Sequence, residues 1–241
     1  YLETEFIYEL IDSLNPKVKE KSDQKEQIKE HRDNPRVFSH ILEQNYLQKK
    51  ENNTVELVGI SIGISLKSVY RFQTEVGGPY YYEDIPLNEM REEGERIAQA
   101  VLNEIREMEE LKDIPVMFAL FREAEQSSPV PGNFIQKTVV DAGEREIGKW
   151  EAIDEEYILF PSSEADDKYA NDAQKVKAFS DKVAEYFPNF VGVVGRGFYV
   201  EDELKSLSLE IPIEFFGKGE VIGFTQYAYG LVQDIFSNHF D

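Results

Sequence analysis

The clearest pattern along the chain is an alternation of apolar residues with glycine and serine. It runs from Val58 to Leu66, where every second residue is Val, Ile or Leu. A period of two is typical of a β-strand that buries one of its faces. The pattern therefore predicts a strand here, and its other face carries only small side chains.

A helix and two strands are predicted to follow this strand. Residues 88–111 place an apolar stripe on one side of a helix whose other side is densely acidic. Pro115 precedes the apolar run 116–121, which is typical of a buried strand. The turn Pro129-Val130-Pro131-Gly132 leads into another strand, residues 134–140. The order in this half is strand, helix, strand, strand.

The second half shows the same order. Strands are predicted for residues 150–160, 190–199 and 207–216, and helices for residues 172–187 and 219–236. Residues 161–167 are polar, and we expect a loop there. The repeated order predicts an α+β, roll-like fold of two structurally duplicated β-α-β-β units, whose mixed sheets are covered by helices.

The first 50 residues have a different character. Residues 1–14 carry apolar side chains at helical spacing, and residues 16–35 are almost entirely charged. This charged stretch is expected to be a mobile linker or an exposed helix. A short helix is expected over residues 35–47. The predicted organisation is therefore an N-terminal segment (1–50), a first repeat (51–146) and a second repeat with the final helix (147–241), the two repeats forming one compact domain.

The composition limits the partners of the protein. The 241 residues include 47 Asp and Glu against 26 Lys and Arg, which gives a formal net charge of −21. Such a surface repels nucleic acid and anionic lipid, whereas cations, basic partners or simple solubility agree with it. No apolar run approaches the length of a membrane span. The chain begins at Tyr1, without a methionine or signal-type stretch, so we expect it to be cut from something longer.

Two glycine motifs resemble the sequence patterns of functional sites. Gly59-Ile60-Ser61-Ile62-Gly63 matches the nucleophile elbow G-x-S-x-G, but the alternation continues through it, so Ser61 is expected to lie flat on a strand. The run 192–197 contains three glycines. They are expected within a strand rather than at the start of a helix, which favours tight sheet packing over phosphate binding. Arg196 remains a candidate for an anion contact.

Catalytic, metal and cofactor centres find little support in the sequence. The chain has three histidines and no cysteine, which disfavours a zinc site, a thiol nucleophile and disulfides. The acidic loop 164–167 lacks the spacing of a calcium-binding loop. Adjacent carboxylates such as Glu155 and Glu156 are expected by chance in a chain this acidic. We therefore expect no catalytic residue, no metal ligand and no cofactor.

Exposed aromatic residues are the strongest candidates for ligand contacts. Tyr80, Tyr81 and Tyr82 follow a Gly-Gly-Pro turn, and exposed tyrosines form platforms for sugar rings or protein partners. A strand edge whose tyrosines alternate between core and surface is the simpler interpretation of the same run. The candidate contact residues are Tyr80, Tyr81, Tyr82, Pro129, Pro131, Gly132 and Arg196.

Several stretches together resemble the CamS family, the sex-pheromone precursor lipoproteins of Gram-positive bacteria. They are HILEQNYL (40–47), GISIGISLKSVY (59–70), VPGNF (130–134), YILFPS (157–162), YFPNFVGVVGRGFY (186–199) and GKGEVIGFTQY (217–227). The stretches occur in the right order from residue 40 almost to the C-terminus. The resemblance is therefore specific, although no single piece would be.

The resemblance implies a location and a biological setting. A pheromone peptide comes from the lipoprotein signal peptide of the family's precursors, and the mature protein stays lipid-anchored outside the cytoplasmic membrane. This chain contains neither the signal peptide nor the lipidated cysteine. The resemblance implies no catalytic residue.

Three hypotheses follow for the folded domain. The first is a non-enzymatic envelope module that binds a small ligand, a peptide or another surface protein. The second is a glycan hydrolase with two carboxylates facing each other across a cleft, about 5–9.5 Å apart. The third is a folded carrier whose selected product is the signal-derived peptide.

Overall fold

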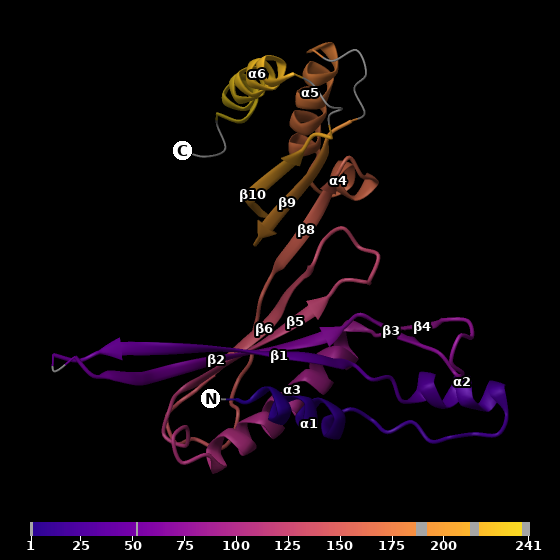
Figure 1. Cartoon of the computed structure of the whole chain (residues 1–241), viewed down its shortest axis with the longest axis vertical. Helices are drawn as coiled ribbons and strands as arrows, with labels where there is room; N and C mark the ends of the chain where they lie inside the picture. The colour runs from indigo at the N-terminus through magenta and orange to yellow at the C-terminus, as the bar shows by residue number, and fades with distance from the viewer. Residues whose placement is uncertain (1, 52, 187–191, 213–216, 238–241) are drawn as a thin grey trace. The chain divides into compact units, whose positions relative to one another are not determined.

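The computed structural model describes residues 2–51, 53–186, 192–212 and 217–237. It divides into two compact units, Tyr1–Asp154 and Glu155–Asp241, and each has a hydrophobic core of its own. Figure 1 shows the elements of both units. Within the described part of the chain, no helix is long and apolar enough to cross a membrane.

A mixed five-stranded sheet forms the centre of the first unit. Its spatial order is β1-β2-β5-β6-β7, and only β2 and β5 run parallel. The strands are β1 (Phe38–Lys49), β2 (Val55–Lys67), β5 (Val116–Glu123), β6 (Gly132–Val140) and β7 (Glu151–Ala152). A mixed sheet with helices confirms the predicted α+β class.

The alternation in β2 buries one face of the strand, as predicted. Ile60, Ile62, Ile64 and Leu66 are fully buried, and they lie opposite the apolar strand β5. Ser61 lies on the strand and donates a hydrogen bond to the Tyr46 hydroxyl at 3.1 Å. The backbone makes no turn into a helix at this serine, so Gly59–Gly63 is not a nucleophile elbow.

The prediction of a helix over residues 35–47 is wrong, because most of this segment belongs to strand β1. It pairs antiparallel with the whole length of β2, from Phe38 beside Leu66 to Lys49 beside Val55. Its inward side chains Phe38 and Ile41 also fit a helical spacing, so periodicity alone did not separate the two possibilities. The partner strand decides the structure here.

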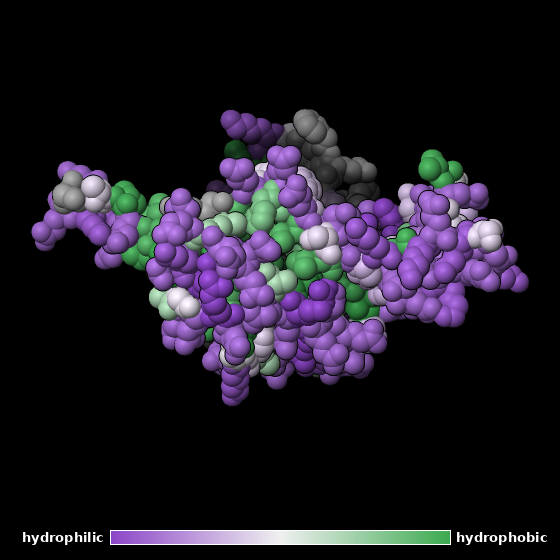
Figure 2. Space-filling view, turned by 90° about the horizontal axis from the view of Figure 1, so that it is seen from below, coloured by the Kyte–Doolittle hydropathy of each residue, from purple (hydrophilic) through white to green (hydrophobic). Residues whose placement is uncertain are grey.

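Strand β2 pairs with β5 only from Ile60 onward. Residues 55–59 of β2 pair only with residues 46–49 of β1, and together they form a two-stranded arm. Hydrophobic side chains are exposed on it, among them Leu47 and Val55. Figure 2 shows a mostly hydrophilic face of the molecule, with hydrophobic residues gathered on the arm at the left and across the middle. The acidic composition is thus largely a surface property.

Helix α3 (Leu87–Glu107) packs on the buried face of this sheet. Its apolar stripe includes Met90, Ile97, Val101 and Ile105, all of them fully buried. Gly94 allows a close approach, since a Cβ there would lie 2.4 Å from Leu120 Cδ1. A larger residue would therefore push the helix away from the strands.

The N-terminal segment is part of the first unit. Helix α1 (Thr4–Leu14) packs its apolar side against the core, and α2 (Gln24–Asp33) lies within the charged stretch with no buried residue. Of the two structures expected for that stretch, the exposed helix is present. A short hairpin, β3 (Val69–Phe72) and β4 (Tyr81–Asp84), forms a separate two-stranded sheet. Strand β4 contains part of the strand edge suggested for Tyr80–Tyr82, whereas β3 was not predicted.

The second unit contains an antiparallel three-stranded sheet of order β10-β9-β8. Its elements are β8 (Glu155–Phe160), α4 (Ser163–Lys168), α5 (Ala170–Tyr186), β9 (Val194–Val200), β10 (Glu203–Glu210) and α6 (Lys218–Phe236). The loop expected at residues 161–167 is largely helix α4, which Ser162 caps by accepting a hydrogen bond from the Ala165 amide. The strand expected over 150–160 is two strands in different units.

The glycines of β9 serve packing, as expected. A Cβ at Gly195 or Gly197 would lie 3.0 Å or less from the Phe160 side chain. The chain continues as a strand beyond them, so these glycines do not open a helix. Residues 187–191 and 213–216, parts of two predicted strands, lie outside the described residues.

Candidate functional site

The β3–β4 hairpin separates the three candidate tyrosines. Tyr81 points toward the core, where its ring stacks on Phe72 with centroids 5.5 Å apart. Tyr80 and Tyr82 are 50% and 57% exposed. The alternation between core and surface is therefore present, and it leaves two of the three rings open to a ligand.

Arg71 lies between the two exposed tyrosines. It is the cross-strand neighbour of Tyr82, and its guanidinium carbon lies 4.4 Å from the centroid of the Tyr80 ring. Within the described part of the chain, Arg71 forms no ion pair. A cation–π contact holds the guanidinium in place and leaves its N–H groups available as donors.

The turn between β5 and β6 faces the same side chains. Glu125, Gln126 and Ser127 line a hollow of about 240 Å³ together with Val69, Arg71 and Tyr82. The hollow therefore combines residues that are more than 40 positions apart in the sequence.

Internal contacts fix this turn. The Ser127 hydroxyl donates to the Glu125 carboxylate at 3.2 Å, and the Ser128 amide donates to the Glu125 carbonyl at 2.9 Å. Gly132 has φ +107°, and a Cβ there would lie 2.1 Å from the Arg122 carbonyl oxygen. Only glycine fits this position.

The remaining candidate contact residues have other places. Pro129 and Pro131 belong to the same turn but do not line the hollow. Arg196 lies in the second unit, where its guanidinium donates to Glu210 at 3.0 Å. The structure thus assembles Tyr80 and Tyr82 around Arg71, a residue that the sequence reasoning missed. The sequence did contain a signal for it: Arg71 stands between two aromatic residues, Tyr70 and Phe72, and side chains alternate along a strand, so Arg71 points outward when these two point inward.

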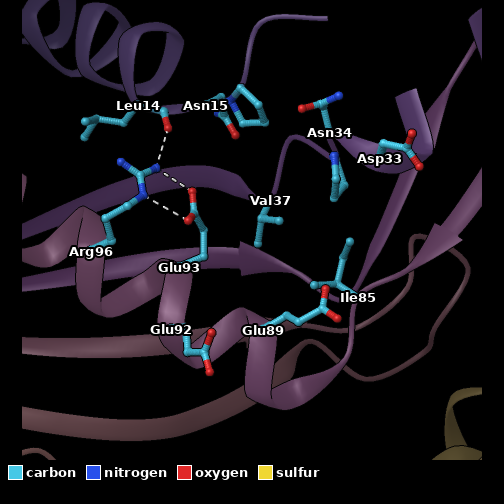
Figure 3. Close-up of a pocket in the computed structure, with 12 residues that line it drawn as sticks. Leu14, Asn15, Asp33, Asn34, Val37, Ile85, Glu89, Glu92, Glu93 and Arg96 are labelled. Atoms are coloured by element: carbon cyan, nitrogen blue, oxygen red, sulfur yellow. Dashed lines mark hydrogen bonds and ion pairs between the residues drawn. The ribbon is translucent and has the colours of Figure 1, made fainter. Parts of the chain in front are cut away.

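A second, larger hollow in the first unit is acidic. It measures about 590 Å³ and lies between the end of α1, residues 33–37 and the first turns of α3 (Figure 3). Glu89, Glu92 and Glu93 line it from one helix. Arg96 pairs with Glu93 and donates to the Leu14 carbonyl at 2.7 Å. The Arg96 guanidinium is therefore engaged within the fold, as is the carboxylate of Glu93.

In the second unit, an aromatic and carboxylate cluster lies between α4, α5 and the β9–β10 turn. Tyr169 and Tyr199 stack with centroids 3.6 Å apart, and the Tyr199 hydroxyl donates to the buried Asp172 carboxylate at 2.9 Å. Burial, and then the hydrogen bond to Asp172, raise the pKa of Tyr199 well above its usual value of 10.0. The Tyr169 hydroxyl donates to Glu156 at 2.8 Å, and burial is again the main reason that its pKa is raised. Asp172 and Glu156 thus each accept a hydrogen bond from a tyrosine, an arrangement that stabilises the fold of the second unit.

The described residues contain no group of three or more His, Asp or Glu side chains arranged to hold a metal ion. The arrangement that remains is a small surface hollow lined by the exposed ring of Tyr82, the Arg71 guanidinium and the Glu125 carboxylate, with Tyr80 beside it in contact with Arg71.

Comparison with known proteins identifies the family. The family model described as the CamS sex pheromone cAM373 precursor matches residues 2–241. The chain belongs to the CamS family. Its membership confirms the resemblance that the sequence fragments indicated.

Two solved CamS structures are similar to this chain over nearly its whole length. The C-terminal domain of the staph-cAM373 precursor from Staphylococcus aureus has a TM-score of 0.79 and 26% identity, covering 99% of this chain and 77% of that one. The sex pheromone precursor from Lactobacillus salivarius subsp. salivarius UCC118 has a TM-score of 0.86 and 27% identity, covering 98% and 69%. No protein with a curated function matches this CamS chain.

Proposed function

We propose that this CamS domain is a non-enzymatic module that binds a cell-envelope component at the hollow between the β3–β4 hairpin and the β5–β6 turn. The observation that carries the proposal is Arg71, which is exposed, forms no ion pair with any described residue, and lies beside the open rings of Tyr80 and Tyr82. In a chain with a formal net charge of −21, an exposed guanidinium with free N–H groups offers donors to a neutral or acidic ligand. Arginine and tyrosine are also the residue types that contribute most to binding surfaces.

The proposal includes the location of the module. We place it outside the cytoplasmic membrane, tethered by a lipid that belongs to the complete precursor, with the pheromone peptide in the signal segment. Membership of the family of pheromone precursors supports this placement. Detergent phase separation of cells that express the complete precursor tests it. A precursor that partitions with the water-soluble proteins contradicts lipid anchoring.

Co-sedimentation with purified peptidoglycan sacculi tests the binding function. The wild-type chain is expected to sediment with the sacculi, and Arg71→Ala and Tyr82→Ala are expected to remain in the supernatant. Tyr8→Ala is a matched control, because Tyr8 is 68% exposed on α1, away from the hollow. If wild type stays in the supernatant, or if all four proteins sediment equally, the proposal is wrong.

A further inference from the structure

We propose that the hollow beside Arg71 and Tyr82 recognises a neutral sugar ring through two adjacent hydroxyl groups. This inference rests on the proposed function and names the chemical class of its ligand. The class follows from which polar groups the hollow presents, from how large it is and from how firmly its walls are held.

The polar groups of the hollow select a ligand that both donates and accepts hydrogen bonds. Arg71 offers only donors, and the Glu125 carboxylate offers only acceptors. Gln126 and Ser127 offer both kinds. A hydroxyl group donates and accepts, so adjacent hydroxyls on one ring satisfy Arg71 and Glu125 together.

Charged ligands of either sign would meet a like charge in the hollow. A purely anionic group would approach Glu125, and a cationic group would approach the Arg71 guanidinium. An apolar ligand would cover both charges without hydrogen bonds, and such burial is costly. The balanced charge of the hollow thus favours a neutral, polyhydroxylated ligand.

The two tyrosines supply the apolar side of the same recognition. Tyr82 lines the hollow, and Tyr80 is fixed beside it by the Arg71 guanidinium over its ring. A sugar ring has a face of C–H groups, which packs against an aromatic ring while the hydroxyls point outward. Tyrosine is well suited to such contacts because it has little rotational freedom to lose.

The size of the hollow favours a single ring. Its volume of about 240 Å³ lies below the range of about 300–1,000 Å³ that is typical of pockets for drug-sized ligands. A protein partner would need about 800 Å² of contact surface on each side. We therefore expect weak binding per ring, with a Kd of about 1 mM, and stronger attachment only to a repeating polymer.

The hollow is held in place before any ligand binds. The antiparallel pairing of Arg71 with Tyr82 fixes one wall, and hydrogen bonds within residues 125–130 fix the other. A ligand therefore orders few side chains on binding, which reduces the entropic cost of the complex.

Titration of the full chain with defined tetramers, followed by nuclear magnetic resonance, tests the inference. The probes are chitotetraose as a neutral glycan, tetragalacturonate as an acidic glycan and tetralysine as a cation. Only chitotetraose is expected to bind with a Kd of about 1 mM. Arg71→Ala and Tyr82→Ala are expected to weaken that binding at least about tenfold, which corresponds to one lost contact of ordinary strength. Tyr8→Ala is expected to bind as wild type does.

A charge-removing variant tests whether recognition depends on the Glu125 charge or only on its hydrogen-bond acceptor. Glu125→Gln keeps a hydrogen-bond acceptor and removes the negative charge, so chitotetraose binding is expected to change less than about threefold. Tighter binding of tetragalacturonate than of chitotetraose, or preferred binding of tetralysine, overturns the inference. So does chitotetraose binding that Arg71→Ala and Tyr82→Ala leave intact.

The two proposals fail in distinguishable ways. If sacculi sediment the chain in a manner that depends on Arg71 and Tyr82 while chitotetraose does not bind, only the sugar inference is wrong. If neither sacculi nor chitotetraose binds, the proposed function is wrong as well. An unchanged unfolding midpoint of each variant shows that lost binding is not lost folding.

Discussion

The two units of this CamS domain differ in how they pair the strands on either side of a helix. In the first unit the β3–β4 hairpin and α3 separate β2 from β5, and these two strands are parallel neighbours. In the second unit α4 and α5 separate β8 from β9, and these two strands are antiparallel neighbours. An intervening helix therefore does not determine strand direction, which depends on where the connection returns.

The units also differ in how the helix is fixed to the sheet. In the first, the helix carries the glycine, Gly94, and the buried guanidinium of Arg106 holds its C-terminal end. In the second, the strand carries the glycines, and a buried Tyr199–Asp172 pair links strand to helix. This comparison predicts which side chains each unit depends on, and Trp150, the only tryptophan, reports on the first unit alone.

Replacing Arg106 is expected to have the largest effect. Arg106 is 2% exposed, and its guanidinium donates to the carbonyl oxygens of Glu144, Leu111, Ile114 and Asp141 at 2.8–3.1 Å. Arg106→Ala leaves these carbonyls with fewer donors and is expected to lower the free energy of unfolding by about 3–5 kcal/mol. Chemical denaturation followed by Trp150 fluorescence measures the loss.

Arg145→Ala is the matched control for Arg106. Arg145 is a surface arginine of the same region, and its ion pair with Glu107 is largely exposed. Such a pair is expected to contribute less than about 1 kcal/mol. Equal effects of the two substitutions would contradict the assignment of Arg106 as the anchor of the first unit.

Gly94→Ala is expected to have the next largest effect. Alanine normally stabilises a helix relative to glycine by about 0.5–1 kcal/mol. Here the new methyl group meets Leu120 and Leu66, both fully buried, so we expect a destabilisation of about 1–3 kcal/mol. Gly148→Ala, where nothing lies within 4 Å, is expected to change stability by less than about 0.5 kcal/mol. A stabilising Gly94→Ala would show that α3 is not packed this closely.

Tyr199→Phe tests the anchor of the second unit. The substitution removes the donor that the buried Asp172 accepts from, so we expect a loss of about 1–3 kcal/mol. Circular dichroism is expected to record this loss, whereas the Trp150 transition of the first unit is expected to stay unchanged. A shift of the Trp150 transition as large as that of the dichroism would mean that the units do not unfold separately.

The raised pKa of Tyr199 gives this prediction a pH dependence. Above pH 10.0 the unfolded chain loses the Tyr199 proton while the folded chain retains it. Stability of the second unit is therefore expected to fall as the pH rises through 10, and less steeply in Tyr199→Phe.

Much of the fold, but less of the site, could be predicted from the sequence. The alternation in β2 and the apolar stripe of α3 specify their elements locally, because one face of each is buried. Strand β1 was mistaken for a helix, because its form depends on pairing with β2 rather than on its own pattern. The exposed pair Tyr80 and Tyr82 was found from the local run of tyrosines after Gly-Gly-Pro, but Arg71 and Glu125 come together only through the hairpin and a distant turn.

The smallest expected effect concerns His31, which joins α2 to the hairpin that lines the hollow. Its ring stacks on Phe72 with centroids 4.4 Å apart, and its Nδ1 lies 3.0 Å from the Tyr70 hydroxyl. Partial burial lowers the pKa of His31 below 6.5, although the neighbouring Glu30 opposes this shift. As the pH falls through 6.5, the unfolded chain takes up a proton before the folded chain does, so stability of the first unit decreases.

His31→Phe keeps an aromatic ring against Phe72 and removes the titration. The change in the free energy of unfolding between pH 7.5 and pH 5, followed by Trp150 fluorescence, is therefore expected to be smaller in this variant than in wild type, by less than about 1 kcal/mol. Carboxylates titrate equally in both proteins, so the difference isolates His31. Identical pH profiles would show that the histidine stack does not hold the hairpin, and the second unit, which contains no described histidine, provides a reference within the same chain.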